Sequence, residues 1–419
     1  MLDRTVAPPF QRTTHFELIE PISIQLPNGV HVHFLSGGQQ EVIKIELIFK
    51  AGRWFEKTWG AAHFAGSLIS KGSKKYSSYE IASVFDLYGA HLEVNPGLDV
   101  VSVALYSLTK NLRPVLELLL DIVTSAMYPE KELQQSKSIY IQNLKVNKEK
   151  TSFQASKLFR KSLFGENHPY GKELEENELD QIKRETIVEH FQTFFKELFV
   201  VVSGKVSDES RNIISEMFTA LPTKVSNSNS YITPEKIAER IVVEKDDSVQ
   251  ASVRIGKRFI GRNHPDYYDV LLLCHVLGGY FGSRLMKNIR EEKGLTYGVY
   301  SSIHTLINDN YLVIGADVNK ENLDLTFSEI RKELSRLRHE LVPADELQIA
   351  RNHFIGSLQA EITTPFSHAD KLKNIIMYSL KGDYYAKLIS RLDSVSAEDL
   401  RIAGDKYFHE ESFFEIAVG

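Results

Sequence analysis

Two short stretches of this 419-residue sequence hold residues whose types and spacing could do chemistry. The first is GAAHFAGSLISKG, residues 60–72, where His63 stands among apolar residues at helical spacing. A zinc site built on one helix needs two histidines four residues apart and a glutamate between them, because residues at that spacing share a helical face. The second is IREEKGLTYGV, where Arg290 and Tyr297 lie across a helix end and the start of a strand. Both of these side chains donate hydrogen bonds.

The elements that must position these residues form an internal repeat. In the first half, two alternating apolar and polar stretches predict strands, followed by two helices, a hairpin and a further helix. These lie at residues 29–35, 42–52, 58–71, 77–89 (opening with the capping box SSYE), 90–108 (turning around Asn95 to Gly97) and 111–123. The second half repeats this order at residues 251–259, 266–279, 283–294, 295–318 and 322–334. A helical segment late in the first half, at 179–195, also matches one late in the second half, at 392–408.

The repeat predicts an α+β fold of two homologous domains, each an antiparallel β-sheet with helices packed mainly on one face. The polar stretch LPTKVSNSNSYITPEK, bracketed by prolines, predicts a linker between them. We therefore expect an N-terminal domain at 1–221, a linker at 222–236 and a C-terminal domain at 237–419.

Composition excludes several classes of protein. The formal net charge of −5 comes without a basic block, so a nucleic-acid partner is not expected. No apolar run approaches the roughly 20 residues that cross a bilayer, and no secretory leader is visible, so we expect a cytoplasmic protein without a membrane partner. The single cysteine, Cys274, lies in the apolar run VLLLCHVL, which favours a buried inert thiol.

Taken together, the sequence resembles the insulinase and pitrilysin family of metallopeptidases (inverzincins), in its processing-peptidase-like branch. The resemblance spans the chain and rests on LPNGVHVHF, GAAHFAGSLISKGS, YGAHLEVN, GENHPYG and FGSRLMKNIREEKGLTYGVYSS. It implies the repeated α+β domain, with two such two-domain units closing like a clam shell around an unfolded peptide.

Active members of that family carry H-x-x-E-H, in which two histidines bind zinc and the glutamate acts as the general base. Here His63 matches the first histidine, whereas Gly66 stands at the glutamate position and Ser67 at that of the second histidine. The glutamate that completes the zinc shell from a later helix falls at Gln142 or Asn143, both neutral amides. We therefore expect no metal and no general base in this chain, because one imidazole cannot retain zinc.

The resemblance assigns Arg290 and Tyr297 to the family's substrate-clamping pair, whose donors meet the substrate carbonyl oxygen over the zinc. A chain with this clamp but without ligands resembles the non-catalytic subunit of a heterodimer, in which a partner chain carries H-x-x-E-H and the zinc. Two features depart from the family pattern. Pro96 follows Asn95 in the edge-strand motif, and the loop GGYFGS is shorter than the glycine-rich loop it resembles in position, which favours a helix end and turn.

Two other hypotheses stay open at this point. The chain could be a catalytically dead structural or peptide-binding homologue, possibly a homodimer, in which Arg290 and Tyr297 have no role. Alternatively, it could be a peptidase by itself, with a metal shell built from His63, His91 or Glu93, although their spacing offers no support.

Overall fold

The structure is a computed structural model that describes residues 5, 17–224 and 230–419. Residues 225–229, in the middle of the expected linker, lie outside the described residues. In the N-terminal half the strands are β1 (Ile22–Gln25), β2 (His31–Ser36), β3 (Val42–Phe49), β4 (His91–Pro96), β5 (Val101–Leu108) and β6 (Leu198–Gly204). The helices are α1 (Ala61–Ser67), α2 (Ser78–Leu87), α3 (Leu112–Ser125), α4 (Glu130–Lys148), α5 (Thr151–Phe164), α6 (Arg184–Phe194) and α7 (Asp208–Phe218).

The C-terminal half repeats the arrangement with strands β7 (Arg240–Val243), β8 (Gln250–Arg258), β9 (Val299–Thr305), β10 (Asn310–Asn319) and β11 (Phe414–Val418). Its helices are α8 (Tyr267–Gly278), the π-helical η4 (Met286–Glu292), α9 (Leu323–His339), α10 (Ala344–Ala360), α11 (Pro365–Met377), α12 (Tyr384–Ser394) and α13 (Ala397–Tyr407). Short 3₁₀ turns are η1 (Arg53–Phe55), η2 (Thr109–Asn111), η3 (Glu176–Gln181), η5 (Lys320–Asn322) and η6 (Glu410–Ser412).

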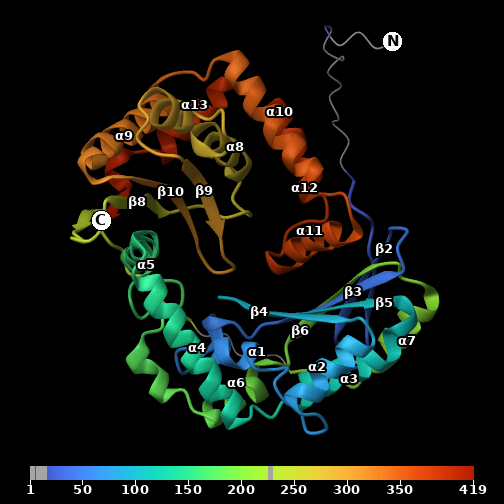
Figure 1. The fold of residues 1–419 in the computed structure, drawn as a ribbon. Coiled ribbons are helices and arrows are strands. Elements are labelled where there is room, and N and C mark those ends of the chain that lie inside the picture. Colours follow the sequence, from blue (N-terminus) through green and yellow to red (C-terminus); the bar gives the residue numbers. More distant parts are fainter. Residues whose placement is uncertain (1–4, 6–16, 225–229) are drawn as a thin grey trace.

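The strand orders confirm the expected pair of α+β domains. Described strands pair in the order β1-β2-β6-β3-β5-β4 in one sheet and β7-β11-β8-β10-β9 in the other, so each sheet draws its strands from one half of the chain. Figure 1 shows the two halves facing each other, with the first sheet below and the second above. The capping box at Ser77 forms as expected, with the Ser77 hydroxyl accepting from the Glu80 amide and the Glu80 carboxylate accepting from the Ser77 amide.

Three local features differ from the sequence expectation. Each sheet contains one parallel pair, β2 with β6 and β7 with β11, because a long helical connection brings the last strand of each half back in the same direction. Helix α1 is shorter than the expected 58–71, since Gly60 at φ 90° starts it late. The β4–β5 turn lies after Pro96, which still pairs with Val101, and it closes with Gly97 donating to the Val100 carbonyl at 2.9 Å.

The two halves exchange helices, which the expectation of helices mainly on one face did not include. Helix α5 of the N-terminal half packs on β8 and β11, while α11 of the C-terminal half packs on β2 and β6 (Figure 1). The inner strands are consequently covered on both faces: β3 is buried from Ile43 to Phe49, and β8 from Ala251 to Gly256. The exchange ties the halves together and defines the hollow between them.

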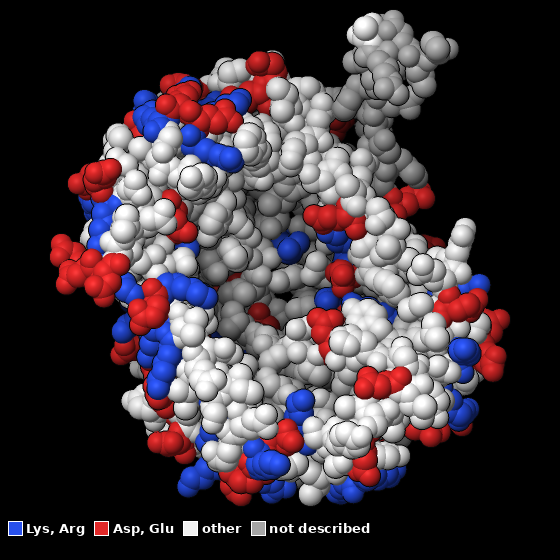
Figure 2. Space-filling view, in the orientation of Figure 1, with Lys and Arg blue, Asp and Glu red and all other residues white. Residues whose placement is uncertain are grey.

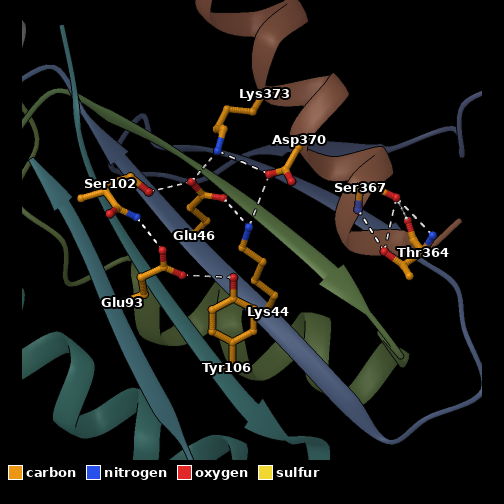
Figure 3. A network of polar contacts seen from close by, with 10 residues as sticks. Lys44, Glu46, Glu93, Ser102, Tyr106, Thr364, Ser367, Asp370 and Lys373 are labelled. Carbon is orange, nitrogen blue, oxygen red and sulfur yellow. Dashed lines mark hydrogen bonds and ion pairs between the residues drawn. The ribbon is translucent and has the colours of Figure 1, made fainter. Parts of the chain in front are cut away.

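A buried polar network joins α11 to the first sheet (Figure 3). Lys44 and Glu46 on β3 are only 7% and 4% exposed, and the Lys44 ammonium lies 2.9 Å from Glu46. Lys373 of α11 donates to Glu46 at 2.8 Å, and Asp370 lies 3.4 Å from both lysines. Burial alone would raise the pKa of Glu46, but the charges of Lys373 and Lys44 outweigh it and lower that pKa to about 2.

The described part of the expected linker packs against the protein. Tyr231 stacks edge-on against Trp54 at 5.0 Å between ring centres, and Thr233 lies 3.3 Å from the His168 ring. Residues 230–239 form no helix or strand, and β7 begins directly after them. In the described residues no helix is long and apolar enough to cross a membrane.

Candidate functional site

His63 lies on α1, in the first turn of a short helix. The Glu56 carboxylate accepts a hydrogen bond from the Ala62 amide at 2.9 Å and so fixes the start of this helix. The His63 ring packs edge-on against Phe64 and Tyr140, with ring centres 5.1 and 5.3 Å apart. Burial, with a smaller contribution from the nearby Arg53, lowers the pKa of His63 to about 4. At neutral pH this histidine is an uncharged ring in an aromatic contact.

Gly66, at the position of the family's general base, has no room for a side chain. A Cβ on Gly66 would meet Pro96 Cβ at 2.9 Å and Val101 Cγ1 at 3.2 Å. Pro96 on β4 therefore fills the space that a glutamate would need, while the adjacent Ser67 is half-buried. The unusual Pro96 and the lost glutamate, which the sequence presents as two separate departures, are in contact in the fold.

The expected third position lies on α4. Both Gln142 and Asn143 on α4 are exposed. The residue of α4 that meets His63 is Tyr140, because two residues along a helix turn the side chain by about 200°. The assignment of the position to Gln142 or Asn143 stays a prediction, and Tyr140 is the His63 neighbour on α4 that sequence reasoning did not single out.

A zinc ion does not fit the residues present at this site. Among the described residues no group of three or more histidine, cysteine, aspartate or glutamate side chains could hold a metal ion. Glu93 is instead engaged with Asn95 at 2.8 Å and with the Tyr106 hydroxyl at 3.5 Å, and the His91 ring lies 6.2 Å from the Tyr106 ring. The alternative metal shell from His63, His91 and Glu93 has no support in this geometry.

The contact between Gly66 and Pro96 makes a stability prediction. We expect Gly66→Ala to destabilise the protein by about 1–3 kcal/mol, as overpacking of a filled core typically does. Changing Pro96→Gly in the same chain should recover part of that loss, since it removes the Cβ that the new methyl group meets at 2.9 Å. Urea unfolding of the two single variants and the double variant measures this coupling.

The matched control is Gly356→Ala on α10, where a Cβ would meet nothing within 4 Å. That change should stabilise the protein by about 0.5–1 kcal/mol, because alanine favours the helix. Equal effects of the two glycine substitutions would contradict the close packing at Gly66.

Glu56 is the strongly perturbed acid beside the degenerate motif. The carboxylate is 4% exposed, and its Oε1 atom has no hydrogen-bond partner, with Arg53 Nε 4.0 Å away. Burial raises the pKa of Glu56 to about 7 despite the hydrogen bond from Ala62 and the charge of Arg53. Glu56 lies next to α1. Its hydrogen bond from the Ala62 amide gives it a structural role, because it holds the start of that helix.

A raised pKa makes Glu56 a source of pH-dependent stability. The folded protein binds a proton here that the unfolded chain releases near its usual pKa of 4.5, so stability falls as pH rises from about 4.5 through 7. Glu56→Gln removes that slope while keeping an acceptor for Ala62. Relative to the parent, the variant should gain about 1–3 kcal/mol between pH 5 and pH 8, measured by urea unfolding. A constant difference between the two proteins at both pH values would show that the burial effect is absent.

Arg290 lies on η4, the π-helix that follows the loop after α8. Such π-helical segments occur mostly as short insertions, frequently at functional sites. The guanidinium carbon of Arg290 lies 4.6 Å from the centre of the Phe281 ring, in a cation–π contact. Phe281 is itself 59% exposed in the turn that ends α8, which agrees with the expected helix end and turn in GGYFGS. Gly294, at φ 63°, ends the segment.

Tyr297 lies in the connection from η4 to β9 and is 91% exposed. The Thr296 hydroxyl donates to the Asp317 carbonyl at 2.7 Å and to the Gly298 carbonyl at 3.0 Å, which fixes this turn. Tyr297 lines a cavity of about 580 Å³ together with Arg254, Tyr300 and Asp317, among others. In the described part of the chain no hydrogen bond or ring contact joins Tyr297 to Arg290. Both side chains are held by their own backbone and neighbours, and both remain accessible.

Figure 2 shows the face between the halves hollowed out, with both basic and acidic groups among the uncharged surface inside. Helix α1 belongs to the lower half, and β9 extends from the upper half toward that hollow (Figure 1). Comparison with family models identifies both halves. The model described as Insulinase (Peptidase family M16) matches residues 35–177, and the model described as Peptidase M16 inactive domain matches residues 181–354. The chain belongs to the insulinase family, peptidase family M16.

Curated relatives of this M16 chain include proteins named as zinc proteases. "Uncharacterized zinc protease YmxG" of Bacillus subtilis is 24% identical over 84% of this chain and 86% of that protein. "Mitochondrial-processing peptidase subunit beta" of Lentinula edodes is 22% identical over 98% of this chain and 92% of that protein. The expected relation to the processing peptidases is thereby confirmed.

Solved structures show the same fold. A peptidase M16 inactive domain from Pseudomonas fluorescens matches with a TM-score of 0.88 at 22% identity, covering 95% of this chain and 98% of that one. The periplasmic protease PqqL from Escherichia coli matches with a TM-score of 0.80 at 16% identity, covering 100% of this chain but 49% of that one. This chain therefore has the fold of about half of that longer protein.

Proposed function

We propose that this chain is the non-catalytic subunit of a heterodimeric zinc peptidase, in which Arg290 and Tyr297 complete the zinc site of a partner chain that carries H-x-x-E-H. The observation that carries the proposal is the contrast between the two sites. The general-base position is closed by the contact between Gly66 and Pro96, whereas Tyr297 is 91% exposed.

The chemistry assigned to each residue follows from its side chain. The Arg290 guanidinium and the Tyr297 hydroxyl would donate hydrogen bonds to the scissile carbonyl oxygen, which gains negative charge when water attacks. Zinc and the general base would come from the partner, so this chain is inactive alone and holds no cofactor. An unfolded peptide lying in the hollow between two such chains would be the substrate.

Purification of the native complex through a tag on this chain tests the proposal. We expect a second chain of similar length with H-x-x-E-H, and about one zinc ion per pair. Recovery of this chain alone, or as a homodimer, without zinc would instead favour a catalytically dead structural or peptide-binding homologue. The missing contact between Arg290 and Tyr297 in the chain by itself is the observation that favours that second candidate.

The proposal also places the chain in the cytoplasm. The single cysteine fits a reducing compartment. One solved neighbour is titled a periplasmic protease. Fractionation of the source cells, followed by detection of this chain in the cytoplasmic or the periplasmic fraction, decides between the two compartments.

A further inference from the structure

A second polar cavity lies in the C-terminal domain, away from the turn that carries Tyr297. It has a volume of about 200 Å³ and is bounded by η4, α9 and the start of α10. Cationic side chains predominate in its lining: Arg284, Lys287, Lys293, Lys332 and Arg336. Only three acidic residues, Glu292, Glu333 and Glu346, line it with them.

Arg284 is the residue that marks this cavity as a binding site. The side chain is 6% exposed, and it holds Glu346 in a two-point contact, Nε to Oε1 at 2.8 Å and Nη2 to Oε2 at 3.0 Å. Its remaining nitrogen, Nη1, is buried and has no hydrogen-bond partner. A buried donor left without an acceptor costs about 1–3 kcal/mol, so an acceptor that reaches Nη1 gains that amount back.

The other charges decide which acceptor fits. Glu333 contacts Arg336 at 3.2 Å, and Glu329, just behind the cavity, lies 3.4 Å from Lys293 and 3.6 Å from Lys332. Lys287 is exposed and forms no ion pair within the described residues. Even when Glu329 is counted, the cationic side chains outnumber the acidic ones by one. Glu340 also contacts Arg336 but is not one of the residues that line the cavity.

Asn288 closes the back of the cavity. Its amide nitrogen donates to Glu329 at 2.9 Å and to Glu333 at 2.8 Å, and its oxygen accepts from Lys293 at 2.7 Å. These bonds engage the carboxylates of the two glutamates, both residues of α9, on the side of the amide. Among the buried lining groups, the unused hydrogen-bonding capacity is donor capacity on Arg284, and Lys287 adds donors at the exposed mouth, where Glu292 is exposed as well. Guanidinium and ammonium groups have no acceptor atoms, so the ligand must bring the acceptors.

We infer that this cavity binds a phosphate group, either free or on a small phosphorylated molecule. Phosphate presents several acceptor oxygens with a negative charge, which matches a forked guanidinium donor flanked by lysines. Arg284 Nη1 is the buried contact and Lys287 the flexible one at the mouth. Neither clamp residue lines this cavity, although η4 carries both Lys287 of the cavity and Arg290 of the clamp.

Titration calorimetry of the isolated full chain with inorganic phosphate tests this inference, at constant ionic strength with chloride as the balancing anion. We expect saturable binding with a Kd of about 1 mM or tighter. A parallel titration with glycerol phosphate separates the two sources: tighter binding than inorganic phosphate points to a phosphorylated molecule, and equal or weaker binding to the free anion.

Two variants locate the bound ion. Lys287→Gln changes an exposed side chain without an ion pair, so it should fold normally and weaken phosphate binding about threefold to tenfold. Arg284→Lys keeps the charge but removes the Nη1 donor, and it should weaken binding by at least as much. The matched control is Lys131→Gln on α4, an exposed lysine in the other half, which should change nothing. Absence of saturable binding up to about 10 mM phosphate, or equal weakening by the Lys131 and Lys287 variants, would overturn the inference.

Discussion

Replacing Arg290→Ala should lower the peptidase activity of the assembled complex by about a hundredfold or more, as loss of one oxyanion donor typically does. The proposed role is stabilisation of charge that exists only in the transition state, so the loss should be in kcat as much as in kcat/KM. Tyr297→Phe, which removes only the hydroxyl, should act in the same direction. The measurement is steady-state hydrolysis of a fluorogenic peptide by the complex, with each variant in place of the parent chain.

Two controls separate this effect from misfolding. Arg113→Ala removes an exposed arginine of the N-terminal half and should leave activity unchanged. Thermal unfolding of the Tyr297→Phe chain should match the parent, because the ring is 91% exposed. Full activity of the Arg290→Ala and Tyr297→Phe complexes would show that these residues do not act on the substrate. The chain would then be a structural subunit.

The second large effect concerns the network that joins the halves. Glu46→Ala should destabilise the chain by about 3–5 kcal/mol, since it leaves the buried Lys44 ammonium without its main counter-charge. The same change at Glu41, whose carboxylate is 63% exposed and 2.8 Å from Lys205, should cost far less, because solvent screens that pair. Urea unfolding of both variants at pH 7 gives the comparison.

The pH dependence of this network has a defined sign. The pKa of Glu46 is lowered from 4.5 to about 2, so its stabilisation is complete above pH 4.5 and is lost as pH falls through 2. The parent should therefore lose its advantage over Glu46→Ala in that acid window. An unchanged difference between pH 7 and pH 3 would show that Glu46 does not carry the stabilising charge.

The sequence predicted the features that depend on periodicity and turn chemistry. Alternating apolar residues located β2 and β3, and the serine–glutamate pair at Ser77 and Glu80 located the start of α2. Strand alternation and the capping box both depend on residues close together in the chain, so both can be predicted directly from the sequence. The resemblance then supplied the fold and the meaning of His63, and the family models confirm that membership.

The features that the sequence did not predict depend on contacts between distant segments. No local sequence pattern indicates that Pro96 fills the space next to Gly66, or that α5 and α11 each cover the sheet of the other half. Alternation in a strand does not reveal whether its neighbour is parallel, so the β2–β6 pairing was missed. The contact of Tyr140 with His63 was not predicted, because spacing along a helix, without a partner, leaves its register open.

The most direct test of a split active site is a titration of the partner chain with this chain. The purified H-x-x-E-H chain, loaded with zinc, should hydrolyse peptide slowly alone and reach full activity when this chain is added in equal amount. His63→Ala in this chain should leave that activation intact, since the zinc belongs to the partner. Full activity of the partner without this chain would contradict the account, as would loss of activation in the His63→Ala chain while it still forms the complex.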